Sequence, residues 1–195
     1  MEPRVAAYQG RLVAPGVLGL VTQLLVGLEA VAQTVLTATT GTGSSIFKMV
    51  AEVDIWLFMA AGIAFLLWFS RCRHNAELLA PGRIAYPDGM AMGAWFVPGL
   101  MWWAPRRIAL DIRRAAGGPG DTVLINAWWI AWLADSLGFV LYALIDPDGN
   151  PNGPLVLVLD VVAAALCVAV ISRITAAQNA AAARAAAGGS SRGNS

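Results

Sequence analysis

Four long apolar segments constrain the fold of this chain more than any other feature of its sequence. They run from Val13 to Thr37, from Met49 to Ser70, from Thr122 to Ile145 and from Pro154 to Thr175. A helix that crosses the hydrocarbon core of a bilayer needs about 20 predominantly apolar residues, and each segment is long enough. The sequence therefore predicts an all-α membrane protein with four transmembrane helices.

The first apolar segment also has a second interpretation, as a cleaved signal peptide. Arg4 and Arg11 precede the segment, and small residues at positions 30–32 are typical of a cleavage site. Pro15 and Glu29 interrupt that pattern, so we favour a retained span. Residues 1–178 are then expected to form a single transmembrane domain. Residues 179–195 are expected to be an alanine-rich stretch that ends in a disordered cytoplasmic tail.

Composition agrees with a membrane protein and excludes some other classes. Of the 195 residues, 58% are hydrophobic and 13% are charged, whereas soluble domains have about 45–50% and about 25%. A net charge of +1 argues against nucleic-acid binding. The sequence contains none of the common nucleophile, zinc-protease, phosphate-loop or CxxC motifs. We therefore expect no metal or cofactor, and an enzyme is the least favoured function.

A fifth apolar stretch, Gly89 to Ala104, decides the predicted topology. It is shorter than a span and is interrupted by Pro98, which cannot donate a backbone hydrogen bond. With four spans and a cytoplasmic N-terminus, every arginine falls on the cytoplasmic side, as the positive-inside rule requires. A fifth span would place Arg106, Arg107 and the whole C-terminus outside. We therefore expect a re-entrant or interfacial segment here and both termini in the cytoplasm, in a protein of the cytoplasmic membrane.

An amphipathic helix is predicted directly after this stretch, over residues 105–116. Ile108, Ile112 and Ala115 share one face at helical spacing. A helix of this kind is typical of segments that lie on a membrane surface. We expect this one to lie on the inner leaflet and to contact anionic lipid headgroups through Arg106, Arg107, Arg113 and Arg114.

Polar residues inside the predicted spans form a candidate intramembrane site. Ionisable residues within spans are costly and often functional, and no Lys or Arg lies inside any of the four segments to pair with them. Two interpretations remain open: the side chains hold the helices together by hydrogen bonds, or they line a cavity that binds a cation or a proton. The candidate residues are Glu29, Gln33, Asp135 and Asp160.

A second candidate motif, "RCRHN", follows the second span. Arg71 and Arg73 are expected to bind carbonyl groups of the re-entrant segment or lipid phosphate, and Asn75 is expected to cap the loop. His74 is a possible general base, although no nucleophile motif accompanies it. We interpret the motif as structural.

Three stretches of the sequence together resemble a known family. They are "FLLWFSRCRHNAELL", "GAWFVPGLMWWAP" and "NAWWIAWL". In this order and spacing they resemble the domain of unknown function 4328 family of small actinobacterial membrane proteins, over residues 49–175. Family members usually carry Asn and Arg where this chain has Met101 and Ala104. The resemblance implies no activity.

The favoured function is a non-enzymatic accessory or interaction protein whose arginine- and tryptophan-rich face meets lipid or an unknown protein partner. The alternative is a small transporter, or a protein that binds a cation or proton through the intramembrane acids. A membrane enzyme is the second alternative. Convergence of Glu29, Asp135 and Asp160 would favour the transporter, and their dispersal would favour the accessory protein.

Overall fold

The computed structural model describes residues 12–39, 45–87, 89–117, 121–145 and 154–192. These residues form four long helices and three short ones, and no strand occurs among them. The long helices are α1 (Gly16–Thr39), α2 (Ser45–Leu79), α5 (Thr122–Ile145) and α6 (Pro154–Arg192). The short elements between α2 and α5 are α3 (Met90–Gly93), the 3-10 helix η1 (Leu100–Trp102) and α4 (Ala104–Ala115).

Three of the helices are long and apolar enough to cross a membrane: α1, α2 and the part of α6 up to Arg184. Two of them extend beyond the predicted apolar segments. The α2 helix begins at Ser45 and continues through the polar motif to Leu79, and α6 continues to Arg192. Most of these extra residues, alanine above all, favour helix although they add little hydropathy. The helix also continues through residues 188–192, which we expected to be disordered, although glycine and serine are weak helix formers. Residues 193–195 lie outside the described residues.

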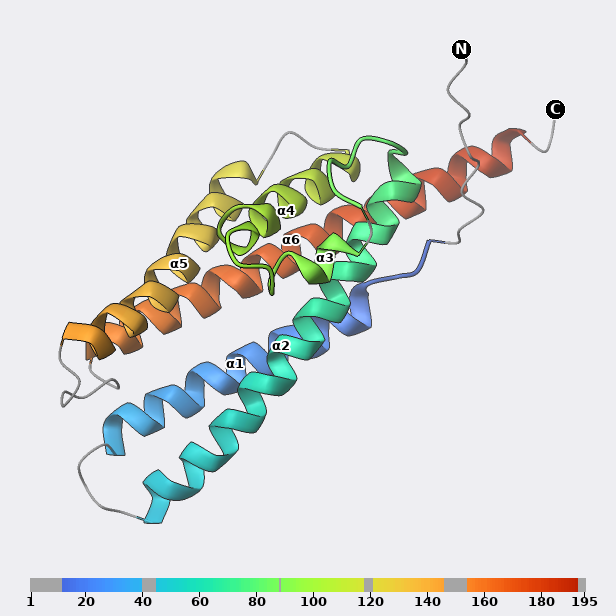
Figure 1. Cartoon of the computed structure of the whole chain (residues 1–195). Coiled ribbons are helices and arrows are strands. Elements are labelled where there is room, and N and C mark those ends of the chain that lie inside the picture. The colour runs from blue at the N-terminus through green and yellow to red at the C-terminus, as the bar shows by residue number, and fades with distance from the viewer. Residues whose placement is uncertain (1–11, 40–44, 88, 118–120, 146–153, 193–195) are drawn as a thin grey trace.

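The long helices form two antiparallel pairs, α1 with α2 and α5 with α6, and α1 also packs along α6 (Figure 1). The start of α1, the end of α2 and the C-terminal half of α6 meet at one end of the bundle. We call this the arginine-rich end. Among the described residues it holds Arg71, Arg73, Arg83, Arg106, Arg107, Arg113, Arg114, Arg173, Arg184 and Arg192.

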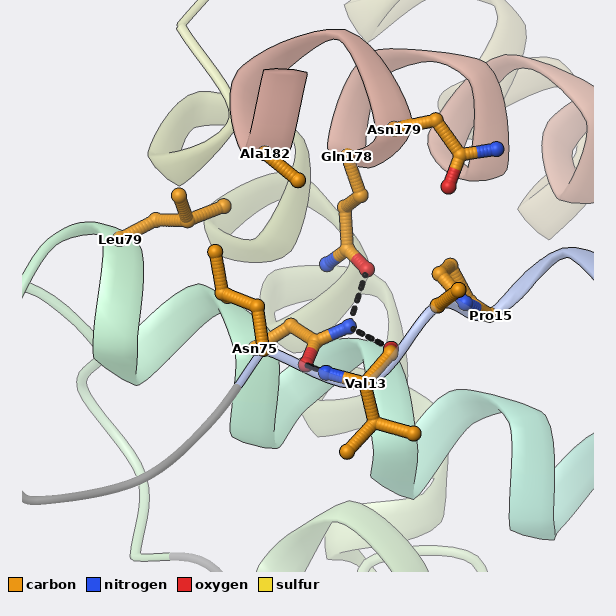
Figure 2. A pocket seen from close by; sticks show the side chains of 9 residues that line it. Val13, Pro15, Asn75, Leu79, Gln178, Asn179 and Ala182 are labelled. Carbon is orange, nitrogen blue, oxygen red and sulfur yellow. Dashed lines mark hydrogen bonds between the residues drawn. The ribbon is translucent and has the colours of Figure 1, made fainter. Parts of the chain in front are cut away.

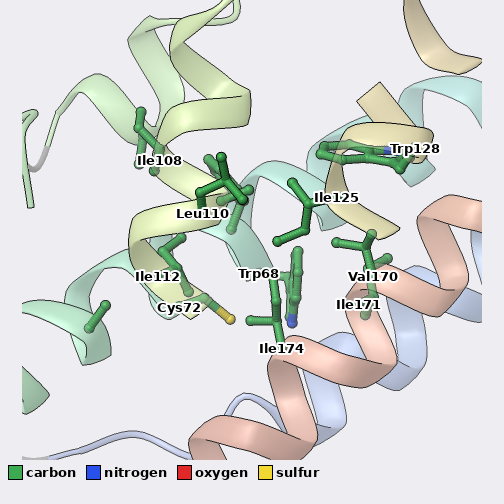
Figure 3. Close-up of a cluster of buried hydrophobic side chains, with 14 of the residues drawn as sticks. Trp68, Cys72, Ile108, Leu110, Ile112, Ile125, Trp128, Val170, Ile171 and Ile174 are labelled. Carbon is green, nitrogen blue, oxygen red and sulfur yellow. The ribbon is translucent and has the colours of Figure 1, made fainter. Parts of the chain in front are cut away.

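Figure 3 shows buried side chains of α2, α4, α5 and α6 packed together in the hydrophobic core. The core lies toward the arginine-rich end, because Trp68 and Cys72 of α2 and Ile171 and Ile174 of α6 belong to it. Trp68 of α2 is fully buried there and donates a hydrogen bond from Nε1 to Thr175 Oγ1 of α6, at 3.1 Å. Side chains of α4, α5 and α6 surround it, among them Ile108, Ile112, Ile125, Ile171 and Ile174. Toward the opposite end the buried side chains are mostly alanines, such as Ala32, Ala61 and Ala163. The four helices are thus tied together most tightly at one end.

Large apolar side chains remain exposed along the outside of the long helices. Leu24 of α1 is 58% exposed, Phe58 of α2 65%, Ile130 of α5 66% and Val158 of α6 57%. Apolar surface on this scale is typical of an interaction surface and not of a soluble monomer. Together with the three apolar helices of spanning length, it indicates a membrane protein.

Candidate functional site

The stretch from Gly89 to Ala104 forms no continuous helix. It consists of α3, a series of turns and η1, and Gly99 before η1 has a φ of 88°. Glycine adopts that left-handed conformation at little cost, and other residues do so only with strain. Pro98 and Gly99 together therefore keep the two short helices from joining into one span.

Trp95 holds this stretch against the bundle through an aromatic cluster. Its ring centroid lies 5.3 Å from that of Phe65 on α2 and 5.3 Å from that of Trp132 on α5, both in edge-to-face geometry. Trp129 adds a hydrogen bond from Nε1 to the carbonyl of Trp102, at 3.3 Å. Because Phe65 lies one turn from Trp68 toward the middle of α2, the stretch reaches about 5 Å past the level of Trp68.

The α4 helix matches the predicted amphipathic helix, but its apolar face is turned toward the protein. Ile108 and Ile112 are both 0% exposed, within the core shared with α2, α5 and α6. The expectation that this face contacts the inner leaflet is therefore wrong. Amphipathic spacing shows that one face is buried, but it cannot distinguish lipid from protein as the covering material.

The four arginines of α4 fall into two pairs with different surroundings. Arg106 donates to Asn126 Oδ1 at 2.8 Å, and Arg113 forms an ion pair with Asp121 at 2.7 Å. Both partners lie at the start of α5, so these two arginines join α4 to α5. Arg107 is exposed, and the Arg114 side chain is 65% exposed beside Asp111. The structure thus leaves Arg107 and Arg114 at the surface.

In the "RCRHN" motif, Arg73 fixes the loop that follows α2. Its Nη2 and Nε atoms donate to the carbonyl oxygen of Tyr86 at 2.6 and 3.3 Å. Its Nη1 atom pairs with Glu77, whose other oxygen accepts a bond from the Gly82 amide at 2.8 Å. Arg73 therefore binds a carbonyl just before the re-entrant stretch, and Glu77, which sequence reasoning missed, holds the turn.

Asn75 joins three parts of the chain (Figure 2). Its side chain accepts a hydrogen bond from the Val13 amide at 3.1 Å and donates to the Val13 carbonyl at 2.8 Å. It also donates to Gln178 Oε1 at 3.1 Å, and Gln178 Nε2 donates to the Cys72 carbonyl at 2.7 Å. Asn75 thus holds the segment before α1 against α2 and α6, and is not the predicted loop cap.

A pocket of about 160 Å³ lies beside this network, lined by Val13, Pro15, Leu79 and Ala182 among others (Figure 2). The amides of Asn75 and Gln178 are buried and bonded to each other. Of the other members of the motif, Arg71 is exposed and His74 is half-buried on α2. Through Arg73 and Asn75 the motif cross-links α2 to the loop after it, to the segment before α1 and to α6, and these partners were not predicted.

The acids of the long helices lie toward the other end of the bundle. The Trp68–Thr175 bond fixes the relative level of α2 and α6. Asp54 is 14 residues from Trp68 and Asp160 is 15 residues from Thr175, or about 21 and 22 Å at 1.5 Å per residue. Both acids therefore lie at nearly one level.

Glu29 and Asp135 lie at a second level, slightly nearer the arginine-rich end. Gly19 of α1 packs beside the Trp68–Thr175 pair, and Glu29 is ten residues further on, about 15 Å away. On α5, Gly138 lies against Leu159, which is 16 residues or about 24 Å from Thr175, so Asp135, three residues before Gly138, is about 20 Å from the same reference level. All four long helices thus place one acid within a layer roughly two turns thick.

These four acids form an interacting group that we call the acid cluster: Glu29, Asp54, Asp135 and Asp160. The Glu29 carboxyl lies within electrostatic range of the other three, and Asp160 within range of both other aspartates. One carboxyl oxygen of Asp54 and one of Asp160 are buried without a hydrogen-bond partner. Asp54 was missing from the predicted site, and it lies near the end of the predicted second span, Met49 to Ser70. Gln33, one turn from Glu29, is half-buried.

The cluster is not arranged as a chelating site. Within the described part of the chain, no three His, Cys, Asp or Glu side chains are placed to hold a metal ion together. What the four acids share is a similar depth in the bundle and partial burial.

Comparison with known families decides the classification. The model of one family, described as domain of unknown function (DUF4328), matches residues 32–185. The chain belongs to the DUF4328 family. Neither curated proteins nor solved structures match it.

The match to the DUF4328 family covers most of the elements described above. It includes the resembling stretches and extends beyond them to the end of α1 and to Gln178. Where the resemblance leads one to expect Asn and Arg, this chain has Met101, half-buried, and Ala104, fully buried as the first residue of α4. Ala104 belongs to the hydrophobic core, so an arginine at this position would bring a charged side chain into buried surroundings.

Proposed function

We propose that this DUF4328 protein spans the cytoplasmic membrane four times and binds protons on the acid cluster. The observation that carries the proposal is convergence: four separate helices each contribute one carboxyl group to the same layer. Like charges in an apolar environment cannot all ionise, so such a group exchanges protons as a unit. Of the functions the sequence left open, a proton-binding or proton-coupled membrane protein accounts for this arrangement best.

The four-span topology has independent support. The α5 helix has 24 residues, pairs antiparallel with α6 and carries exposed apolar side chains such as Ile130 and Val140. With α5 as the fourth span, the arginine-rich end lies in the cytoplasm, as the positive-inside rule favours. The acid cluster then lies in the outer half of a hydrocarbon core about 30 Å thick.

A topology experiment tests the first part of the proposal. Reporter domains fused after Ser195 and inserted at Gly149, which lies outside the described residues, should report opposite sides of the membrane. A reporter inserted after Pro81, in the turn that follows α2, should agree with the C-terminal fusion. Reporters at Gly149 and Ser195 on one side would rule out four spans.

Proton binding is measured most directly by the carboxyl carbonyl stretch in infrared difference spectra of the reconstituted protein between acid and alkaline pH. Protonated carboxyl bands are expected in the wild type, and Glu29→Gln and Asp160→Asn should each remove or shift part of them. Glu52→Gln is the matched control, because Glu52 is exposed on α2 close to Asp54.

The same variants separate protons from cations. If added sodium or calcium stabilises the wild type and Glu29→Gln is insensitive to it, the cluster binds a cation and the proton proposal is wrong. If the protonated carboxyl bands in the infrared spectra are the same in the wild type, Glu29→Gln and Asp160→Asn, then these acids bind no exchangeable protons. The accessory-protein interpretation would then be preferred.

A further inference from the structure

A second feature of the surface lies apart from the acid cluster. Between the α2–α3 region and the end of α4, aromatic and cationic side chains are exposed along one strip. Phe96 is 72% exposed, Trp102 40% and Trp103 47%, and Arg107 and Arg114 are exposed on α4. We call these five residues the aromatic–arginine strip.

Helical spacing places three residues of the strip on the same face of α4. Trp103 lies directly before α4, and Arg107 and Arg114 follow it by four and eleven residues, so the three share a face at about 100° per residue. The opposite face of α4 is the one buried against the protein through Ile108 and Ile112. The strip is therefore the outer side of an anchored helix and has a rigid backing.

The strip is continuous with the apolar surface of the spans. Trp95, next to Phe96 of the strip, packs its ring against Phe65 of α2 and Trp132 of α5. Leu67 of α2 and Ile130 of α5, close to these contacts in sequence, are 48% and 66% exposed. Tryptophan is enriched at the membrane–water interface. The aromatic residues thus meet the bilayer at the depth where the first turns of the spans enter it.

Charge at this end of the molecule matches an anionic surface. The described arginines there outnumber the acids, which are Glu77, Asp111 and Asp121. Arg106 and Arg113 are turned toward α5, so Arg107 and Arg114 are the cations of α4 that a headgroup can reach. Guanidinium groups bind phosphate with good geometry.

We propose that the aromatic–arginine strip binds anionic phospholipid of the adjacent leaflet. Phe96, Trp102 and Trp103 lie among the upper acyl chains, and Arg107 and Arg114 bind headgroup phosphates. The proposal rests on the membrane location of the protein and is independent of the acid cluster.

Spin-labelled lipids test the proposal on the intact protein in phosphatidylcholine bilayers. The wild type should associate more strongly with labelled phosphatidylglycerol than with labelled phosphatidylcholine. Each arginine near an anionic surface contributes about a fivefold preference. The double variant Arg107→Gln/Arg114→Gln should lose at least that factor. Arg173→Gln, also exposed at the arginine-rich end but on α6, is the matched control and should keep the preference.

The depth of position 96 in the bilayer is measured with a spin label on the variant Phe96→Cys. The label is placed in a Cys72→Ala/Cys167→Ala background, after that background has been shown to remain folded. The label should collide more with oxygen, which concentrates in the bilayer, than with a water-soluble relaxation reagent. An unchanged lipid preference in the double variant would overturn the proposal. So would an equal loss in Arg173→Gln, or a label at position 96 that collides mainly with the water-soluble reagent.

Discussion

Replacing Asn75 by alanine is expected to destabilise the protein by roughly 2–4 kcal/mol, because it removes three hydrogen bonds and leaves buried partners unsatisfied. Gln178 Oε1 loses its donor in a buried position. At a partly buried position the Val13 amide loses its acceptor and the Val13 carbonyl loses its donor. Thermal or denaturant unfolding in detergent measures the change. The segment before α1 should also become more susceptible to proteolysis, because Asn75 is what binds it.

Asn179 provides the control for Asn75. It is adjacent to Gln178 and lines the same pocket, but its side chain is exposed. Asn179→Ala should therefore change stability by about 0.5 kcal/mol or less. A double-mutant cycle of Asn75→Ala with Gln178→Ala should show a coupling energy of about 0.5–3 kcal/mol. If Asn75→Ala costs no more than Asn179→Ala, or if the two network residues do not couple, the cross-link described above contributes little to stability.

The second large effect is expected at Gly19 of α1. A Cβ atom added there would lie 2.9 Å from Thr175 Oγ1 and 3.3 Å from Trp68 Nε1. These are the two atoms of the hydrogen bond between α2 and α6, so alanine would disturb both the packing and the bond. We expect Gly19→Ala to cost about 2–4 kcal/mol, from overpacking of about 1–3 kcal/mol together with the weakened bond. Gly19→Leu should prevent stable assembly altogether.

Gly27 tests whether the effect at Gly19 comes from packing. It lies on the same helix, and nothing is within 4 Å of a Cβ built there, so Gly27→Ala should be neutral or stabilise by about 1 kcal/mol through helix propensity. Thr175→Ala removes the nearest obstructing atom. Gly19→Ala should therefore cost less in a Thr175→Ala background than alone. Equal costs in both backgrounds would mean that α1 does not approach the pair as closely as described.

Much of the helical framework follows from local sequence properties. The predicted third segment has the same bounds as α5, and α4 begins and ends within one residue of the predicted amphipathic helix. Hydropathy and spacing are local, and helices depend mainly on local residues. The interruption at Pro98 likewise follows from the chemistry of one residue. The number of spans and the orientation of the termini stay predictions.

What the sequence did not predict depends on contacts between distant residues. Gln178 is 103 positions from Asn75, and a single glutamine in an alanine-rich stretch carries no signal by itself. Asp54 is in the acid cluster because α2 packs beside α1 and so brings its carboxyl group near Glu29. Ile108 and Ile112 were predicted to face lipid, because spacing along one helix does not indicate what packs against it. An alignment of paired positions would carry that missing information.

The packing of α1 against α6 has a consequence for how the protein is made. Val13 and Gly19, near the start of the chain, are fixed by Asn75, Gln178 and Thr175. During synthesis the last two of these partners emerge only after α5 has been made. The α1 helix must therefore stay in the membrane, or beside the insertion machinery, without its partner until α6 has been made. Any chain interrupted before α6 would expose Gly19 and Trp68 on a helical hairpin without a partner, a form that quality-control proteases could recognise.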